Sequence, residues 1–257
     1  AYVTAAPLFE FALRMGDNAL ILGQRVSAWC GHAPALEEDI AMANVGLDLI
    51  GQAKLWLTLA GEVEGAGRDA DALAFLRDTR DFRNVLLVEQ PNGDYGQTLM
   101  RQFLFDAWHL PMLKALRQST DGRVADIAGK CAKEADYHLD RSSDLVIRLG
   151  DGTAQSRAKM QAALDLLYPF LHEMTAADAT DQAIATAGLG PRLADIRESV
   201  ERTVASVAAD ATLALPAAPA RIVLQNWSGK AGRHTEEFGR LIAEMQWLQR
   251  AYPGATW

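Results

Sequence analysis

Two short stretches, Asp106-Ala-Trp-His109 and Glu134-Ala-Asp-Tyr-His138, decide how this chain is best interpreted. In each, a carboxylate is followed three or four residues later by a histidine. On a helix, that spacing places both side chains on one face. Apolar residues recur around both stretches with helical periodicity. We therefore predict that both lie in long helices, with Asp106 and His138 on the buried faces.

Helical periodicity continues over most of the chain, and no useful length of sequence alternates with the period of two that is typical of strands. Caps and helix breakers complete the prediction. The expected helices span about 7–29, 36–60, 95–119, 123–149, 153–175 and 178–187, with another from Pro191, a last one from Thr235 to the Tyr252-Pro-Gly254 stop, one or two short helices within 71–87, and a linker over 213–220. The fold class is therefore all-α. Because the composition shows no break, one domain over 1–257 is favoured.

Composition excludes several classes of protein. With 257 residues and 49% hydrophobic side chains, the chain can bury a sizeable core and is too apolar to be disordered. The formal net charge of −8 argues against a general binder of nucleic acid or anionic membranes. Cys30 and Cys131 have no C-x-x-C partner, which favours a reducing compartment. We see neither a leader nor a membrane-spanning stretch, so we expect a cytoplasmic protein.

Paired carboxylates and histidines on long helices are typical of the ferritin-like di-iron proteins. There, two helices of a four-helix bundle each give a Glu-x-x-His pair, and the other two each give one carboxylate. This chain matches that design incompletely. Asp48-Leu-Ile-Gly51 has glycine where a histidine would stand, and Glu134-Ala-Asp-Tyr137 has tyrosine there. We predict a ferritin-like four-helix bundle core with additional peripheral helices, from which the metal has been lost.

We expect the remnant of the lost di-iron site to be a cluster of polar side chains. It comprises Gln24, Asp48, Gln52, Asp106, Glu134, Tyr137 and His138. An ionised carboxylate in an apolar row is costly unless it is paired, metal-bound or protonated. We therefore favour a buried structural cluster that fixes helix register, with no catalytic residue and no metal. The alternative is an oxidase with an asymmetric ligand set of Asp48, Asp106, Glu134, His109 and His138.

A second segment, Gly229-Lys-Ala-Gly-Arg-His-Thr235, is basic and leads into the last predicted helix. Backbone N–H groups and the dipole at a helix N-terminus favour anions. Lys230, Arg233 and His234 are therefore candidate contacts for an anion, such as a CoA phosphate, or for an acidic patch on a partner. The glycine spacing matches no phosphate loop, so a solvated loop is the competing interpretation. An acyl-CoA-binding helical module is the third functional hypothesis.

Several longer motifs resemble one known family. They are Leu13-Arg-Met-Gly-Asp-Asn18, Trp29-Cys-Gly-His-Ala-Pro34, Ala43-Asn-Val-Gly-Leu-Asp-Leu-Ile-Gly-Gln-Ala53, Leu87-Val-Glu-Gln-Pro-Asn-Gly93 and Glu244-Met-Gln-Trp-Leu-Gln-Arg250. Over essentially the whole chain, the sequence is similar to the C subunits of the bacterial phenylacetyl-CoA 1,2-epoxidases. Those enzymes are multicomponent monooxygenases of aerobic phenylacetate degradation.

The resemblance implies a subunit that has no cofactor of its own. In that family the A subunit holds the di-iron site and binds phenylacetyl-CoA. The C subunit shares its ferritin-like fold, lacks the full ligand set and pairs with it as a structural partner. A small B subunit bridges the assembly, and a reductase with flavin and an iron–sulfur cluster supplies electrons from NADPH. The expected partners are thus the A and B subunits and, indirectly, the reductase, or a second copy when the chain is alone, but neither nucleic acid nor membrane.

Overall fold

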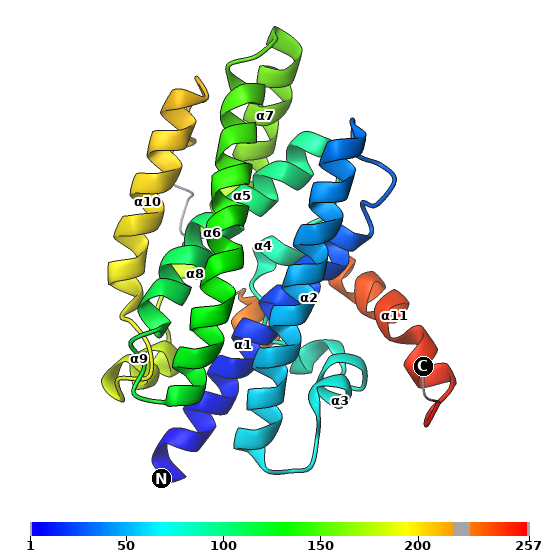
Figure 1. Ribbon diagram of the computed structural model, residues 1–257, viewed down its shortest axis with the longest axis vertical. Coiled ribbons are helices and arrows are strands. Elements are labelled where there is room, and N and C mark those ends of the chain that lie inside the picture. The colour runs from blue at the N-terminus through cyan, green and yellow to red at the C-terminus, as the bar shows by residue number, and fades with distance from the viewer. Residues whose placement is uncertain (1, 218–226, 256–257) are drawn as a thin grey trace. The chain divides into compact units, whose positions relative to one another are not determined.

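Every regular element in the described part of the chain is a helix, so the all-α prediction is confirmed. The computed structural model describes residues 2–217 and 227–255. The chain divides into two compact units: unit 1 is Ala1–Pro91 with Val223–Trp257, and unit 2 is Asn92–Ile222. A pair of long helices forms the centre of each unit (Figure 1). The single domain over 1–257 stays a prediction.

Unit 1 is built on a hairpin of α1 (Tyr2–Ser27) and α2 (Leu36–Glu64), which pack along each other (Figure 1). A helix was predicted over 7–29, and within α1 all residues from 11 to 23 are buried. Asp39 fixes the corner between the two helices. Its carboxylate accepts hydrogen bonds from the backbone N–H of Gly31 at 2.8 Å and of Ala33 at 3.4 Å. The first-turn acid of α2 thus orders the loop before the helix.

Short helices and the end of the chain complete unit 1: α3 (Ala70–Phe75), η1 (Thr79–Asp81), α4 (Leu86–Glu89), η3 (Gly229–Ala231) and α11 (Glu236–Ala251). Helix α11 is held against the end of α3. The buried Gln246 side chain donates to the carbonyls of Ala74 at 3.1 Å and Arg77 at 2.9 Å. The C-terminal helix is therefore fixed to residues about 170 positions earlier in the chain.

A buried ion pair joins α1 to the loop after α3. The guanidinium of Arg77 binds both carboxylate oxygens of Asp17, and the two side chains are 2% and 0% exposed. The backbone N–H of Arg83 donates to the same carboxylate at 2.8 Å. Arg77 also lies 4.2 Å from the centre of the Phe82 ring. The pair is thus fully desolvated and well satisfied, as a buried salt bridge requires.

Unit 2 is built around α5 (Tyr95–Leu116), whose residues from 98 to 110 are all buried. Helices α6 (Gly122–Gly150), α7 (Ala154–Leu167) and α10 (Leu193–Asp210) pack against it (Figure 1). His138 lies on the buried face of α6, as predicted, and it shares that face with Val124, Ala128, Cys131, Ala135 and Ser142. Leu145 and Leu149, near the end of α6, are only half-buried.

Several predicted boundaries were wrong. The helix expected over 153–175 breaks at Pro169, which has no N–H for a helical hydrogen bond, into α7, η2 (Tyr168–Phe170) and α8 (Leu171–Thr175). The helix expected from Pro191 begins at Leu193, because Arg192 is the N-cap and pairs with Asp195 at 2.8 Å.

The ends of the long helices also differ from the prediction. Helix α1 begins and ends earlier than the expected 7–29, α2 continues past residue 60 to Glu64, and α5 ends at Leu116, before residue 119. The stretch 178–187 forms α9 (Ala179–Thr186) as predicted.

The paired long helices of each unit are consistent with the ferritin-like fold. The linker predicted over 213–220 lies partly outside the described residues, as does Trp257. Within the described residues, no helix has both the length and the apolar character needed to cross a membrane.

Candidate functional site

The centre of unit 2 contains a buried carboxyl group. Asp106 of α5 is 0% exposed, and its two oxygens accept hydrogen bonds from Gln102 Nε2 at 2.7 Å and Ser142 Oγ at 2.8 Å. Burial raises the pKa of Asp106 to about 8, because the two neutral donors offset only part of the desolvation of a carboxylate. At neutral pH the protonated, uncharged form of this side chain therefore predominates.

Two buried histidines lie in the same unit, His109 on α5 and His138 on α6. Burial lowers the pKa of His109 to about 3, and the proximity of His138 contributes to that lowering. The His109 ring packs on Phe105 with 4.7 Å between ring centres. His109 is thus a neutral side chain packed in the core. Ser142, the partner of Asp106, lies one turn after His138 on α6 and links the two helices.

This donor set does not fit a di-iron centre. Such a centre needs several ionised carboxylates to balance the charge of two metal ions, together with two histidines. Of the two carboxyl groups expected as ligands in unit 2, Glu134 is only half-buried, and Asp106 is already bound by an amide and a hydroxyl. Among the described residues, no group of three or more His, Cys, Asp or Glu side chains is arranged to hold a metal ion. We derive no metal chemistry from these side chains.

The other predicted members of the remnant differ in how deeply they are buried. In unit 1, Gln52 is 1% exposed, whereas Gln24 and Asp48 are half-buried. In unit 2, Glu134 is half-buried. The placement of Tyr137 in a buried cluster was wrong, because its side chain is 54% exposed. Tyr137 directly precedes an inward-facing residue on α6, and consecutive residues of a helix point in different directions.

A second polar centre, in unit 1, holds the segment before α11. His234 is 5% exposed at the side chain, and its Nδ1 lies 3.1 Å from Glu89 Oε2. Its Nε2 lies 3.1 Å from the carbonyl of Phe82, and the other oxygen of Glu89 accepts from the backbone N–H of Thr235 at 3.0 Å. Both ring nitrogens thus face internal acceptors. The prediction that His234 contacts an external anion was wrong.

Two glycines allow this segment to approach the backbone of residues 80–84. A Cβ on Gly229 would lie 1.9 Å from the carbonyl oxygen of Asn84, and one on Gly232 would lie 2.3 Å from that of Arg80. Gly232 also has a φ of +72°, which favours glycine. The glycine spacing that matches no phosphate loop is therefore explained by close packing. Of the other predicted contacts, Lys230 is half-buried and Arg233 is exposed.

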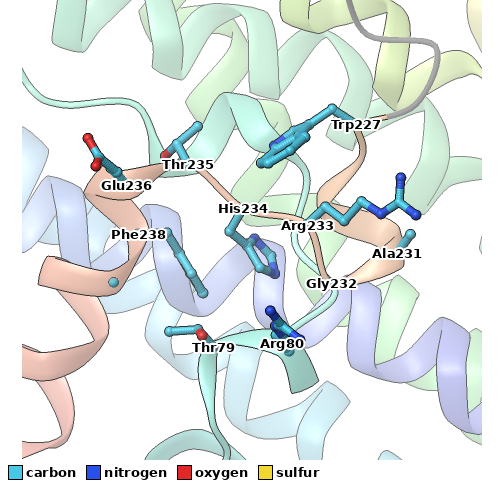
Figure 2. Close-up of a pocket in the computed structure, with 11 residues that line it drawn as sticks. Thr79, Arg80, Trp227, Ala231, Gly232, Arg233, His234, Thr235, Glu236 and Phe238 are labelled. Carbon is cyan, nitrogen blue, oxygen red and sulfur yellow. The ribbon is translucent and has the colours of Figure 1, made fainter.

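The same segment forms one wall of a pocket of about 600 Å³ (Figure 2). Thr79 and Arg80 of η1 form the opposite wall. Between them, His234 stacks on Phe238 with 4.1 Å between ring centres. Trp227, which is 49% exposed, stands at another edge of the pocket.

Several of these residues were missed by reasoning from sequence. Gln102 lies one turn before Asp106, and that spacing was a usable signal for a hydrogen-bonded pair. Glu89 and Asp17 gave no such signal, because their partners lie far away in the chain. His234 is 145 positions from Glu89, and Arg77 is 60 positions from Asp17.

The fold and its buried residues define a class, a ferritin-like helical protein whose polar core does not fit a di-iron centre. The chain belongs to the phenylacetic acid catabolic protein family, whose model matches residues 2–257. It is 46% identical over 250 residues to the C subunit of the 1,2-phenylacetyl-CoA epoxidase of Escherichia coli strain K12. That alignment covers 97% of this chain and 99% of its relative.

Proposed function

We propose that this chain is a non-catalytic, cytoplasmic subunit of a multicomponent monooxygenase that epoxidises phenylacetyl-CoA. In this role it pairs with a catalytic homologue and stabilises it. The similarity to the C subunit of an epoxidase over nearly its whole length supports the assignment to such a complex. A small bridging subunit and a reductase are the other proposed members of the assembly. The di-iron centre belongs, in this proposal, to the catalytic partner.

The environment of Asp106 carries the non-catalytic part of the proposal. In a catalytic di-iron site, the carboxylates would be ionised and directed at the metal ions. Here the amide of Gln102 and the hydroxyl of Ser142 occupy both oxygens of the buried carboxyl group. Those contacts make it a structural group that links α5 to α6. The competing hypothesis of an oxidase in its own right has no comparable support among the described residues.

We expect the purified chain to contain no stoichiometric iron. The reason is that the expected ligand set has too few carboxylates for two ferrous ions, and its fully buried member, Asp106, is already bound by Gln102 and Ser142. Elemental analysis of the chain, expressed alone in iron-supplemented medium, measures this directly. The catalytic homologue prepared in parallel is the positive control. Close to two irons per chain would establish the oxidase hypothesis instead.

The outer face of α2 is the proposed docking surface for the catalytic homologue. Leu36, Ile40 and Leu47 are 70%, 54% and 71% exposed, and their spacing places them on one side of the helix. Exposed apolar side chains in such a row are typical of protein interfaces. The neighbouring helix α1 offers no such surface over residues 11–23, because they are all buried.

Substituting the docking surface is expected to break the complex without unfolding the chain. In the double variant Ile40→Asp and Leu47→Asp, two desolvated charges would oppose an interface that typically buries ~2,000 Å² or more. Co-purification with the catalytic homologue should be lost, while circular dichroism stays unchanged. Leu166→Asp, at a residue of α7 that is 51% exposed, is the matched control and should leave the complex intact.

The stabilising role has its own test. Co-expression with this chain should raise the soluble yield and melting temperature of the catalytic homologue, because a partner that binds only the native state shifts the unfolding equilibrium. A catalytic homologue that is fully soluble and active with the reductase alone would refute the structural-partner role.

A further inference from the structure

His234 of unit 1 makes two contacts that a neutral imidazole cannot make together. Its Nδ1 lies 3.1 Å from Glu89 Oε2, and its Nε2 lies 3.1 Å from the carbonyl oxygen of Phe82. A neutral imidazole has one N–H donor and one nitrogen with a lone pair. One of the two contacts would therefore direct a lone pair at an acceptor oxygen. Both contacts can be favourable only when the pair of His234 and Glu89 carries an additional proton.

The hydrogen bonds of Glu89 place that proton on the imidazole ring. Glu89 Oε1 accepts from the backbone N–H of Thr235 at 3.0 Å, which favours an ionised carboxylate. The side chains of His234 and Glu89 are 5% and 0% exposed, so solvent water is largely excluded from both. With His234 as an imidazolium, each ring nitrogen donates to an acceptor, and each carboxylate oxygen of Glu89 accepts a hydrogen bond. The geometry thus fits a buried, charge-assisted pair.

Charged side chains of both signs face this pair from the elements packed around it. The Arg25 guanidinium of α1 donates to the backbone carbonyl of Glu89 at 2.6 Å, and Arg83 Nη1 donates to the carbonyl of Phe82 at 2.9 Å. Arg83 is itself paired with Glu10 at 3.0 Å. Because acids accompany the cations, the surrounding charge does not by itself displace the proton from the ring. Further cations are Arg77, Arg80 and Arg233, and further acids are Asp17, Glu236, Glu237 and Glu244.

We propose that His234 and Glu89 form a proton-dependent clamp, which holds the segment before α11 on residues 82–89. In the closed state the His234 imidazolium binds both Glu89 and the Phe82 carbonyl. As the pH rises, this proton passes to solvent, one of the two contacts becomes repulsive, and the segment separates from residues 82–89. Phe238, which is buried and stacks on His234 with 4.1 Å between ring centres, becomes accessible in the open state (Figure 2). This inference does not depend on the proposed function.

Amide hydrogen exchange of α11 in the full chain, measured by mass spectrometry from pH 6 to 9, tests the clamp. Opening releases one proton, so it should become up to about ten-fold more frequent for each pH unit in that range. Glu89→Gln should abolish this dependence, because its amide N–H can donate to the Nδ1 of a neutral His234 while its amide oxygen still accepts from Thr235. The ratio of the parent's exchange rate to that of Glu89→Gln at the same pH cancels the intrinsic pH dependence of exchange, and we expect that ratio to rise with pH.

His32→Gln is the matched control, because it removes an exposed histidine from the loop between α1 and α2 and should leave the pH dependence of α11 exchange unchanged. Nitrogen-15 NMR of the parent protein reports on the His234 ring without any substitution at the pair. At pH 7.5, where a histidine in water is mostly neutral, both ring nitrogens of His234 should carry a proton. An unprotonated ring nitrogen at that pH, or a ratio of exchange rates that stays constant from pH 6 to 9, would overturn the proposal.

Discussion

Replacing Arg77 with alanine is expected to lower the free energy of unfolding by about 3–5 kcal/mol. Its guanidinium is the buried counter-charge of Asp17, which is 0% exposed. Without Arg77, the carboxylate would keep the hydrogen bond from the backbone N–H of Arg83 but would remain a buried charge that has lost its cation. The change should also loosen the loop after α3, because Arg77 Nη1 donates to the carbonyl of Asp81 at 3.0 Å.

Urea unfolding of the single and double variants separates the free energy that the ion pair contributes from the cost of desolvating its two charges. Arg77→Met combined with Asp17→Leu should be less destabilised than Arg77→Ala alone, because no charge is then buried without a partner. Arg202→Ala, which breaks an exposed pair with Glu198, should not measurably change stability. If Arg77→Ala unfolded at the same urea concentration as the parent protein, the pair would have no stabilising role.

The helical elements could be predicted because their signals are local. The spacing of small and apolar residues along 123–149 placed His138 and Ser142 on the inner side of α6, and both are 1% exposed. An aspartate within an apolar row likewise predicted the burial of Asp106. Periodicity predicts only which side of its own helix a residue occupies, and this was sufficient to predict that these residues are buried.

The partners of those residues could not be predicted in the same way. We expected Asp106 in one cluster with Glu134, whereas the hydrogen bonds found for the Asp106 carboxyl group come from Gln102 and Ser142. His234 was interpreted from its basic neighbours, but Glu89, which binds it, lies on another helix. Such pairings depend on how distant segments pack, and no local pattern contains that information.

The motifs that carried the family resemblance prove to contain structural contacts. Asp17 binds Arg77, and Asn18 beside it accepts a hydrogen bond from the backbone N–H of Val85 at 2.8 Å. Glu89, in another of these motifs, binds the segment before α11. These contacts fix the end of the chain and the loop after α3 to α1 and α4. At these positions, therefore, the motifs of the resemblance contribute contacts that hold unit 1 together.

The contribution of Asp106 to the stability of the protein is expected to fall as the pH rises from about 4 to 8. Its pKa is raised from 3.8 to about 8 in the folded state, so in this window the folded chain holds a proton that the unfolded chain has lost. The stabilisation from that proton is complete below pH 3.8 and is lost as the pH approaches 8, at roughly 1.4 kcal/mol per pH unit. His109 acts in the opposite direction below pH 6.5, because its lowered pKa keeps the folded form neutral.

Two substitutions of Asp106 isolate this effect when each is compared with the parent protein at the same pH, where the contribution of His109 cancels. Asp106→Asn imitates the protonated carboxyl group, because its amide oxygen can accept from Gln102 Nε2 and its amide nitrogen can donate to the Ser142 hydroxyl. It should match the parent near pH 5 and be the more stable protein at pH 9. Asp106→Ala leaves the Gln102 amide and the Ser142 hydroxyl without their acceptor, so it should cost about 1–4 kcal/mol near pH 5.

Urea unfolding at pH 5, 7 and 9 provides the free energies, and epoxidation by the reconstituted complex provides the functional readout. Because Asp106 links α5 to α6 and binds no reacting group in our proposal, both variants should support epoxidation once the complex has assembled. A pH-independent difference between Asp106→Asn and the parent would show that the carboxyl group is ionised in the folded chain. A stable Asp106→Asn variant in an assembled but inactive complex would instead make Asp106 a participant in catalysis, because only the loss of its proton chemistry would distinguish that variant from the parent.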